Sequence, residues 1–305
     1  MRLLPLFETF GKLVQPSAAT RDLKELSGDE LNEIASSVKY SGMVLLRGFT
    51  VDLERFRRLS DRLCRNFRVH VFPWAREAVS EDRTIQTALR GNGHVPLHKE
   101  LSFTPVTPDV VWFYCQKPPE LGSGATLVCD GAAVHLKLSE ETRALFEEKP
   151  ITYSQVWPRV SWNALFGTDE VDEAKTLLGS YSGVHVRTNN GNDMDEIIAF
   201  DYSVMAAQPS KFHKATAFAN SILMVPSGAF GISSSYGRNM NVSFQGGAPI
   251  SDAVRTEIAI TAHSMTRKIC WQEGDIVALD NTRLMHGRDP FAGPRAILTR
   301  LGDWI

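Results

Sequence analysis

The feature that most constrains the fold is a series of short apolar runs, rich in β-branched and aromatic residues and separated by proline and glycine. Residues 110–115 and 125–129 form two such runs, with Pro118, Pro119 and a Gly-Ser-Gly turn between them. Runs of this length and composition are typical of buried strands. Because they recur at wide spacing and do not alternate regularly with helices, the sequence favours an antiparallel β core over repeated βαβ units.

Other segments show helical periodicity or further strand character. Ser27 and Glu30 have the spacing of a capping box, and an apolar stripe begins behind them at Leu31. We expect helices over 52–67, 139–148, 169–178 and 251–267, strands over 42–49, 196–201, 221–226, 274–280 and 295–301, and a polar hairpin at Asn189-Asn190-Gly191-Asn192. These elements describe an α+β chain, rich in β structure, that forms a single domain over residues 1–305.

Charge and hydropathy exclude several classes of partner. The chain has 33 basic and 35 acidic side chains and a formal net charge of −2, without the one-sided positive charge of a nucleic-acid-binding protein. No apolar run reaches the roughly 18 residues that a membrane-spanning helix needs. Glu8 and Lys12 interrupt the apolar start of the chain before a signal-peptide core develops. We therefore expect a cytoplasmic protein with neither a nucleic-acid nor a membrane partner, and the sequence leaves its oligomeric state open.

Two separate segments carry candidate metal ligands. His98 and Glu100 stand at positions i and i+2, which share one face of a strand, so an imidazole and a carboxylate could bind one metal while Lys99 points away. This three-residue pattern is weak by itself. His286 follows the strand expected over 274–280 and offers a third ligand. Two histidines and one carboxylate form the facial triad that suits non-heme Fe(II) and leaves three coordination positions open.

Arg295 lies shortly after His286 and opens the last expected strand. A buried guanidinium there could hold a carboxylate through two parallel hydrogen bonds. The alternative for this arginine alone is a salt bridge on the surface.

Taken together, these motifs resemble those of the Fe(II)/2-oxoglutarate-dependent dioxygenases of the taurine dioxygenase and clavaminate synthase-like superfamily. The resemblance extends in order over roughly residues 40–300, and no single motif is decisive. The motifs are Val44-Leu45-Leu46-Arg47-Gly48-Phe49, Leu97-His98-Lys99-Glu100, Cys115-Gln116-Lys117-Pro118-Pro119, Gly122-Ser123-Gly124-Ala125-Thr126, Asp130-Gly131, and Trp271-Gln272-Glu273-Gly274-Asp275 through Arg295.

The resemblance implies a double-stranded β-helix (jelly-roll) core with flanking helices, an N-terminal cover of helices and strands over 1–95 and a lid-like insertion over about 153–215. It also implies that Fe(II), the co-substrate 2-oxoglutarate and O2 are the cofactors. The iron ligands that it implies are His98, Glu100 and His286.

In the same family pattern, Arg295 and the Thr126 hydroxyl bind the C5 carboxylate of 2-oxoglutarate. Arg300 is the alternative, because family members often carry a second basic residue on the last strand. Strand alternation places Arg300 on the opposite face from Arg295, so we expect Arg295 and Thr299 to point inward together. Glu100 stands where many relatives have Asp. It still ligates in the clavaminate synthase-like branch, and it excludes the halogenase variant, which needs a small residue there.

The implied reaction is hydroxylation of an unactivated C–H bond, with succinate and CO2 as co-products, and desaturation, epoxidation and cyclisation are alternatives. We expect the substrate to be an amino acid or an amino-acid-derived natural-product intermediate, free or tethered to a carrier protein. A sulfonate or aryloxy acid is the alternative substrate class. Gln86, Arg90 and Asn92 precede the first iron motif and are the candidate substrate contacts.

Two hypotheses outside this class stay open at this stage. A zinc hydrolase could use the same three ligands, but it would leave Arg295 without a purpose. A non-catalytic binding protein with the same fold would be expected to have lost a ligand or the arginine, and this sequence retains both.

Overall fold

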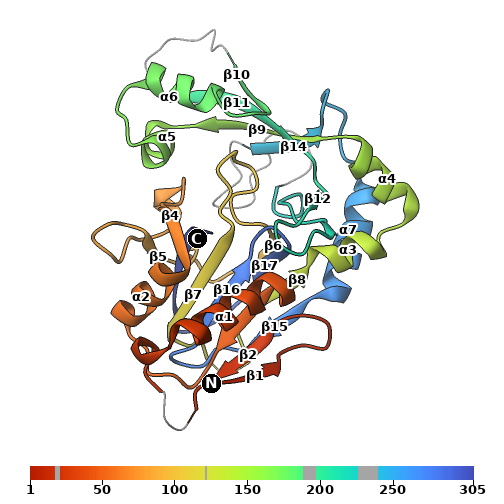
Figure 1. The fold of residues 1–305 in the computed structure, drawn as a ribbon. Helices are drawn as coiled ribbons and strands as arrows, with labels where there is room; N and C mark the ends of the chain where they lie inside the picture. Colours follow the sequence, from red (N-terminus) through yellow and green to blue (C-terminus); the bar gives the residue numbers. More distant parts are fainter. Residues whose placement is uncertain (18–20, 121, 188–196, 226–239) are drawn as a thin grey trace.

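The computed structural model describes residues 1–17, 21–120, 122–187, 197–225 and 240–305 (Figure 1). Its largest element is an eight-stranded sheet. In spatial order the sheet contains β1 (Arg2–Pro5), β2 (Lys12–Gln15), β3 (Met43–Leu46), β16 (Ile276–Asp280), β7 (Val110–Lys117), β18 (Ala296–Trp304) and β4 (Cys64–Arg68), and β5 (Ile85–Thr87) pairs with β18 beside this path. Among the described strands, all neighbours pair antiparallel except β2 and β3, as the run pattern predicts.

A second sheet packs against the first and carries the site described below. Its four strands are, in order, β15 (Arg267–Ile269), β8 (Thr126–Asp130), β17 (Leu284–Arg288) and β6 (Val95–His98). Residues of both sheets meet in one apolar core, for example Val111 and Phe113 from β7 with Leu127 from β8 and Met285 from β17. The functional side chains therefore lie at a boundary between two packed sheets.

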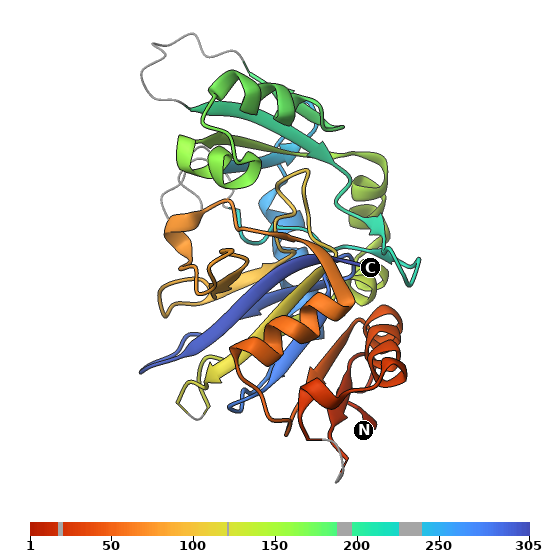
Figure 2. The ribbon, with the colours of Figure 1, turned by 60° about the vertical axis from the view of Figure 1, so that its left-hand side comes forward.

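The central strands β3, β16 and β7 of the larger sheet are buried on both faces over most of their length, which explains why their sequences are almost continuously apolar. Phe113 on β7 points into the core between the sheets, whereas its neighbours Trp112 and Tyr114 belong to a second apolar cluster. Helices α1 (Gly28–Ser41) and α2 (Leu53–Leu63) supply the other side of that second cluster and cover this face of the sheet (Figure 2). The capping box predicted at Ser27 and Glu30 begins α1.

The remaining elements form a third sheet and further helices. The third sheet contains, in order, β10 (Val184–Val186), β11 (Ile198–Val204), β9 (Ile151–Trp157) and β14 (Met240–Phe244), and β12 (Gln208–Pro209) pairs with β13 (Thr216–Ala217). The other helices are α3 (Gly131–Lys137), α4 (Glu140–Glu148), α5 (Arg159–Phe166), α6 (Val171–Gly179) and α7 (Asp252–Met265), with short 3-10 helices at Leu23–Glu25 and Pro73–Ala75. In Figure 1 the third sheet lies across the upper end of the molecule, with α5 and α6 beside it. The fold is a mixed α+β arrangement dominated by sheets.

One expected helix is too long, and one expected strand is wrong over its described residues. The helix expected over 52–67 ends at Leu63, because Cys64 is extended and begins β4, which pairs with Trp304 of β18. The strand expected over 221–226 is a turn over the described residues 221–225, where the Asn220 side chain accepts a hydrogen bond from the Ile222 amide at 3.0 Å.

The polar hairpin expected at 189–192 lies outside the described residues. Among the helices that the structure describes, none combines the length and the apolar character required to cross a membrane.

Candidate metal centre

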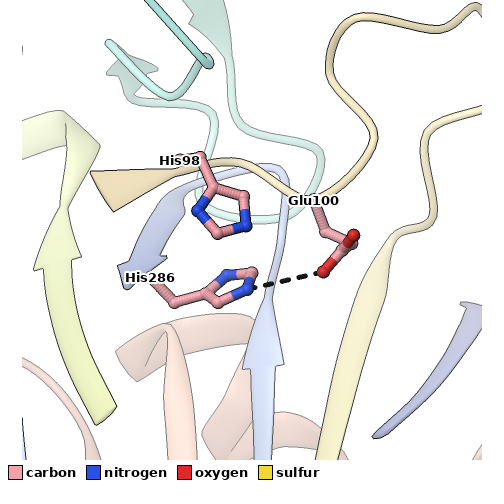
Figure 3. A group of neighbouring side chains, drawn as sticks. All are labelled: His98, Glu100 and His286. Atoms are coloured by element: carbon pink, nitrogen blue, oxygen red, sulfur yellow. Dashed lines mark ion pairs between the residues drawn. The ribbon is translucent and has the colours of Figure 1, made fainter. Parts of the chain in front are cut away.

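Three buried side chains, from the end of one strand, the middle of another and a turn, converge at one point (Figure 3). His98 ends β6 and His286 lies on β17, and the two residues are direct partners in the register of this antiparallel pair. Glu100 follows His98 by two residues. One ligand atom from each of the three side chains lies within 4.8 Å of the others, and all three residues are buried. This set of donors fits a non-heme Fe(II) site.

Glu100 does not lie on the same strand as His98, although strand alternation predicts that it does. β6 ends at His98, and Glu100 lies in the turn that follows. Asn281, directly after β16, holds that turn: its side-chain oxygen accepts the Glu100 amide at 2.9 Å, and its nitrogen donates to the carbonyl of Glu100 at 3.0 Å and of Pro108 at 2.9 Å. The sequence pattern assigned no role to Asn281, because its partners are far away along the chain.

Replacing Asn281 with alanine should lower the free energy of unfolding by about 3 kcal/mol, since three buried backbone groups lose their partners and each such loss costs about 1–3 kcal/mol. Urea denaturation measures this change. Asn92→Ala is the control, because Asn92 is exposed, and its effect should stay within about 0.5 kcal/mol. Equal stability of the two variants would contradict the role given to Asn281.

The protonation states at this site favour metal binding. Burial alone would raise the pKa of Glu100, but the charge of Arg76 and hydrogen bonds from His286 and His70 hold it well below its usual value. Burial, together with the neighbouring His286, lowers the pKa of His98 to about 3. Glu100 is therefore an anion and His98 a neutral imidazole at physiological pH, and these are the forms that ligate metals.

Ring contacts orient both imidazoles. Nδ1 of His98 lies 2.9 Å from the Pro96 carbonyl, so it carries the proton and Nε2 keeps its lone pair. Nε2 of His286 lies 3.5 Å from Oε2 of Glu100, and the ring packs edge-on against Phe113 at a centroid distance of 5.3 Å. These contacts fix the orientation of both imidazoles.

A pocket of about 410 Å³, partly open to solvent, adjoins the candidate metal ligands. The described lining residues are Arg76, Ala88, Leu89, Val95, His98, Phe113, Thr126, His286, Gly287, Arg288, Arg295 and Thr299.

Arg295 and Thr126 lie on one wall of this pocket. The Arg295 guanidinium donates to the Gly124 carbonyl at 3.2 Å and lies over the Phe291 ring, and no described carboxylate forms an ion pair with it. Burial and the nearby Arg288 lower the pKa of Arg295 to about 10, so it remains a cation. Oγ1 of Thr126 accepts a hydrogen bond from Trp271 at 3.0 Å, which leaves the Thr126 hydroxyl proton available for another acceptor.

The two other candidates on β18 lie on opposite faces of the strand. Thr299 lines the pocket with Arg295. Arg300 points away from it: its guanidinium donates to Ser60 at 2.6 Å and to Asp61 at 2.7 Å.

None of the three candidate substrate contacts is among the described residues that line the pocket. Gln86 is buried, and its side chain accepts the backbone amide of His70 at 3.0 Å. Arg90 pairs with Glu77, and Asn92 is exposed. Leu89, from the same stretch of chain, faces the pocket instead.

Sequence reasoning missed Arg76 and His70, which contact Glu100. Nη2 of Arg76 donates to Oε2 of Glu100 at 2.8 Å, and its Nη1 donates to Thr299 at 2.7 Å. His70 lies 3.2 Å from Oε1 of Glu100. Both residues lie in the segment between β4 and β5, and a lone His or Arg there carries no local signal.

The chain matches one protein family model and resembles known proteins in sequence. The family model described as "Taurine catabolism dioxygenase TauD, TfdA family" matches residues 4–301. The chain is 23% identical to 3-((Z)-2-isocyanoethenyl)-1H-indole synthase of Fischerella ambigua (strain UTEX 1903), over 92% of this chain and 88% of that protein. It is 24% identical to the dapdiamide synthesis protein DdaC of Enterobacter agglomerans, over 95% of this chain and 90% of that protein.

The fold is shared with solved structures. One is PvcB, described as an Fe, alpha-ketoglutarate dependent oxygenase from an isonitrile synthetic pathway. It aligns with a TM-score of 0.57 and 17% identity, covering 99% of this chain and 91% of that one.

Proposed function

Because this chain belongs to the TauD, TfdA family of taurine catabolism dioxygenases, we propose that it oxidises an unactivated C–H bond of an amino acid or an amino-acid-derived natural-product intermediate. The chain is an Fe(II)/2-oxoglutarate-dependent dioxygenase, and its cofactors are Fe(II), the co-substrate 2-oxoglutarate and O2. The strongest support for the location of the site is the buried cluster of His98, Glu100 and His286, whose ligand atoms lie within 4.8 Å of one another beside a pocket.

In this proposal His98, Glu100 and His286 hold the iron. When bound, Fe(II) with 2-oxoglutarate and O2 supplies the oxidising power for C–H cleavage, with succinate and CO2 as co-products. Arg295 binds the distal carboxylate of 2-oxoglutarate through two N–H groups, and the Thr126 hydroxyl donates a further hydrogen bond to it. Leu89, Val95 and Phe113 are apolar walls that limit access of water to the reacting centre.

The proposal also covers the type of β core, the lid and the extent of the domain. We propose that the eight-stranded sheet and the sheet that contains β17 form a double-stranded β-helix, and that residues of about 153–215 act as a lid over the pocket. The whole chain would then be one dioxygenase domain with an N-terminal cover over 1–95. Support comes from the common apolar core of the two sheets and from the position of the third sheet at one end of the molecule.

The substrate class is proposed from the names of the relatives. One is the synthase of an isocyanoethenyl indole and the other is a dapdiamide synthesis protein, so both names refer to the making of small natural products. Hydroxylation is the proposed outcome, and desaturation, epoxidation or cyclisation are the alternatives. A carrier-tethered form of the substrate and a sulfonate or aryloxy acid are further arms of the test.

A substrate screen tests this proposal. The Fe(II)-loaded protein is supplied with 2-oxoglutarate and O2, and succinate release is measured with amino acids, their N-modified derivatives, carrier-bound thioesters, taurine and aryloxyacetates. We expect succinate release to rise at least about tenfold over the substrate-free rate with one amino-acid-derived compound. Stimulation by taurine or an aryloxyacetate alone would overturn the substrate class, and turnover with Zn(II) but without 2-oxoglutarate would overturn the reaction class.

A further inference from the structure

The two carboxylate oxygens of Glu100 have different neighbours. Oε2 faces His286 Nε2 at 3.5 Å and accepts a hydrogen bond from Arg76 at 2.8 Å. Oε1 lies 3.2 Å from Nε2 of His70. The oxygen that faces His286, one of the two other proposed metal ligands, is therefore Oε2, and Oε1 is turned toward a third histidine.

The contacts of His70 define which of its nitrogens carries the proton. The Phe72 amide donates to Nδ1 of His70 at 3.1 Å, so Nδ1 keeps its lone pair and Nε2 carries the hydrogen in the neutral ring. Nε2 is then the donor to Oε1 of Glu100. The His70 amide donates in turn to Gln86 at 3.0 Å, and the His70 side chain is 2% exposed, so the ring has little freedom to move.

We propose that His70 is a positioning residue that reserves Oε1 of Glu100 and so restricts this carboxylate to one-oxygen ligation through Oε2. This inference rests on the proposed iron site. Three protein donors leave three positions on a six-coordinate iron, and 2-oxoglutarate takes two of them. A Glu100 that ligated through both oxygens would occupy a fourth position and leave none for O2.

The length of the Glu100 side chain makes this restraint necessary. Glutamate has one more rotatable bond than aspartate, and the carboxylate can turn about it unless it is anchored. Arg76 supplies a second anchor, because its guanidinium joins Oε2 of Glu100 to Thr299 on β18. Restraint of a ligand by such outer contacts typically changes metal affinity by about 10- to 100-fold.

Two amide variants that differ in reach test the inference. In His70→Gln the amide nitrogen takes the approximate place of Nε2 and can still donate to Glu100, whereas in His70→Asn it lies too close to the backbone. His135→Gln is the matched control, because His135 is also buried and pairs with Glu147 at 2.8 Å in the contact between α3 and α4. The readouts are the dissociation constants of Mn(II) and Co(II) by calorimetry, the visible spectrum of the Co(II) protein, and the affinity of the Co(II) protein for 2-oxoglutarate.

We expect His70→Asn to weaken metal binding about 10- to 100-fold, to alter the Co(II) spectrum and to weaken 2-oxoglutarate binding. His70→Gln should stay within a few-fold of wild type, and His135→Gln should be unchanged. Wild-type values and spectrum in the Asn variant would overturn the role of His70, and so would an equal loss in the Gln and Asn variants. If the Asn variant does not fold, His70→Leu, which also lacks the donor, replaces it. A wild-type protein that binds no metal at this site would instead overturn the proposed function.

Discussion

Replacing His286 with alanine is expected to abolish substrate-dependent succinate formation while the chain remains folded. The imidazole supplies one of three proposed iron donors, and its loss should weaken metal binding by more than the roughly 100-fold that the loss of an outer contact can cost. The backbone of β17 stays paired with β6 and β8 whatever the side chain is, so the sheet persists. His98→Ala should behave in the same way.

Two measurements separate loss of iron from loss of fold. Adding 2-oxoglutarate without oxygen to the Fe(II)-loaded wild type should produce a weak visible charge-transfer band, and both alanine variants should lack it. Thermal unfolding should remain cooperative in both. His135→Ala, a buried histidine outside the pocket, should retain the band and the activity. Undiminished succinate release in either ligand variant would disprove the assignment of iron to these residues.

The clustering of the three candidate metal ligands could be predicted because they occur in short motifs, but the way Glu100 is held could not. The prediction brought His98, Glu100 and His286 together, and the structure places their ligand atoms within 4.8 Å of one another. It relied on strand alternation for Glu100, whereas the strand ends at His98 and the Asn281 side chain supports the turn. A contact between residues so far apart in sequence leaves no mark on local periodicity.

The same contrast appears in the fold. Alternation along the last strand correctly separates Thr299 from Arg300, because period two is a purely local property of an extended chain. The helical spacing of Leu63 and Phe67 predicted a helix that continues to residue 67. The helix ends at Leu63 instead, because Cys64 pairs with Trp304 at the far end of the sequence. Tertiary pairing overrides propensity at such an element boundary.

The residues that line the pocket were the least predictable part of the candidate site. Proximity in sequence to the first iron motif suggested Arg90, but its guanidinium pairs with Glu77. Arg76, which is more distant from that motif, lines the pocket instead. Side-chain direction in irregular segments depends on partners that the local sequence does not reveal.

Arg295→Gln is expected to raise the concentration of 2-oxoglutarate required for half-maximal turnover by about 10- to 100-fold, since a charged hydrogen-bonding contact is worth about 1.5–3 kcal/mol. The substrate requirement should change far less, because the proposed partner of Arg295 is the distal carboxylate of the co-substrate. Steady-state kinetics with each reactant varied in turn measure both quantities.

Arg300→Gln is the matched control, at a position on β18 close to Arg295 in the sequence. Arg300 is buried, whereas Arg295 is half-buried, and it has the same functional group, but it donates to Ser60 and Asp61 outside the pocket. Its replacement should reduce the free energy of unfolding and leave the 2-oxoglutarate requirement within about twofold of wild type. The opposite pattern, with a normal requirement in Arg295→Gln and a raised one in Arg300→Gln, would transfer carboxylate binding to Arg300. Because the Arg295 side chain lines the pocket and the Arg300 guanidinium binds Ser60 and Asp61 outside it, that result would also require β18 to change its register when the co-substrate binds.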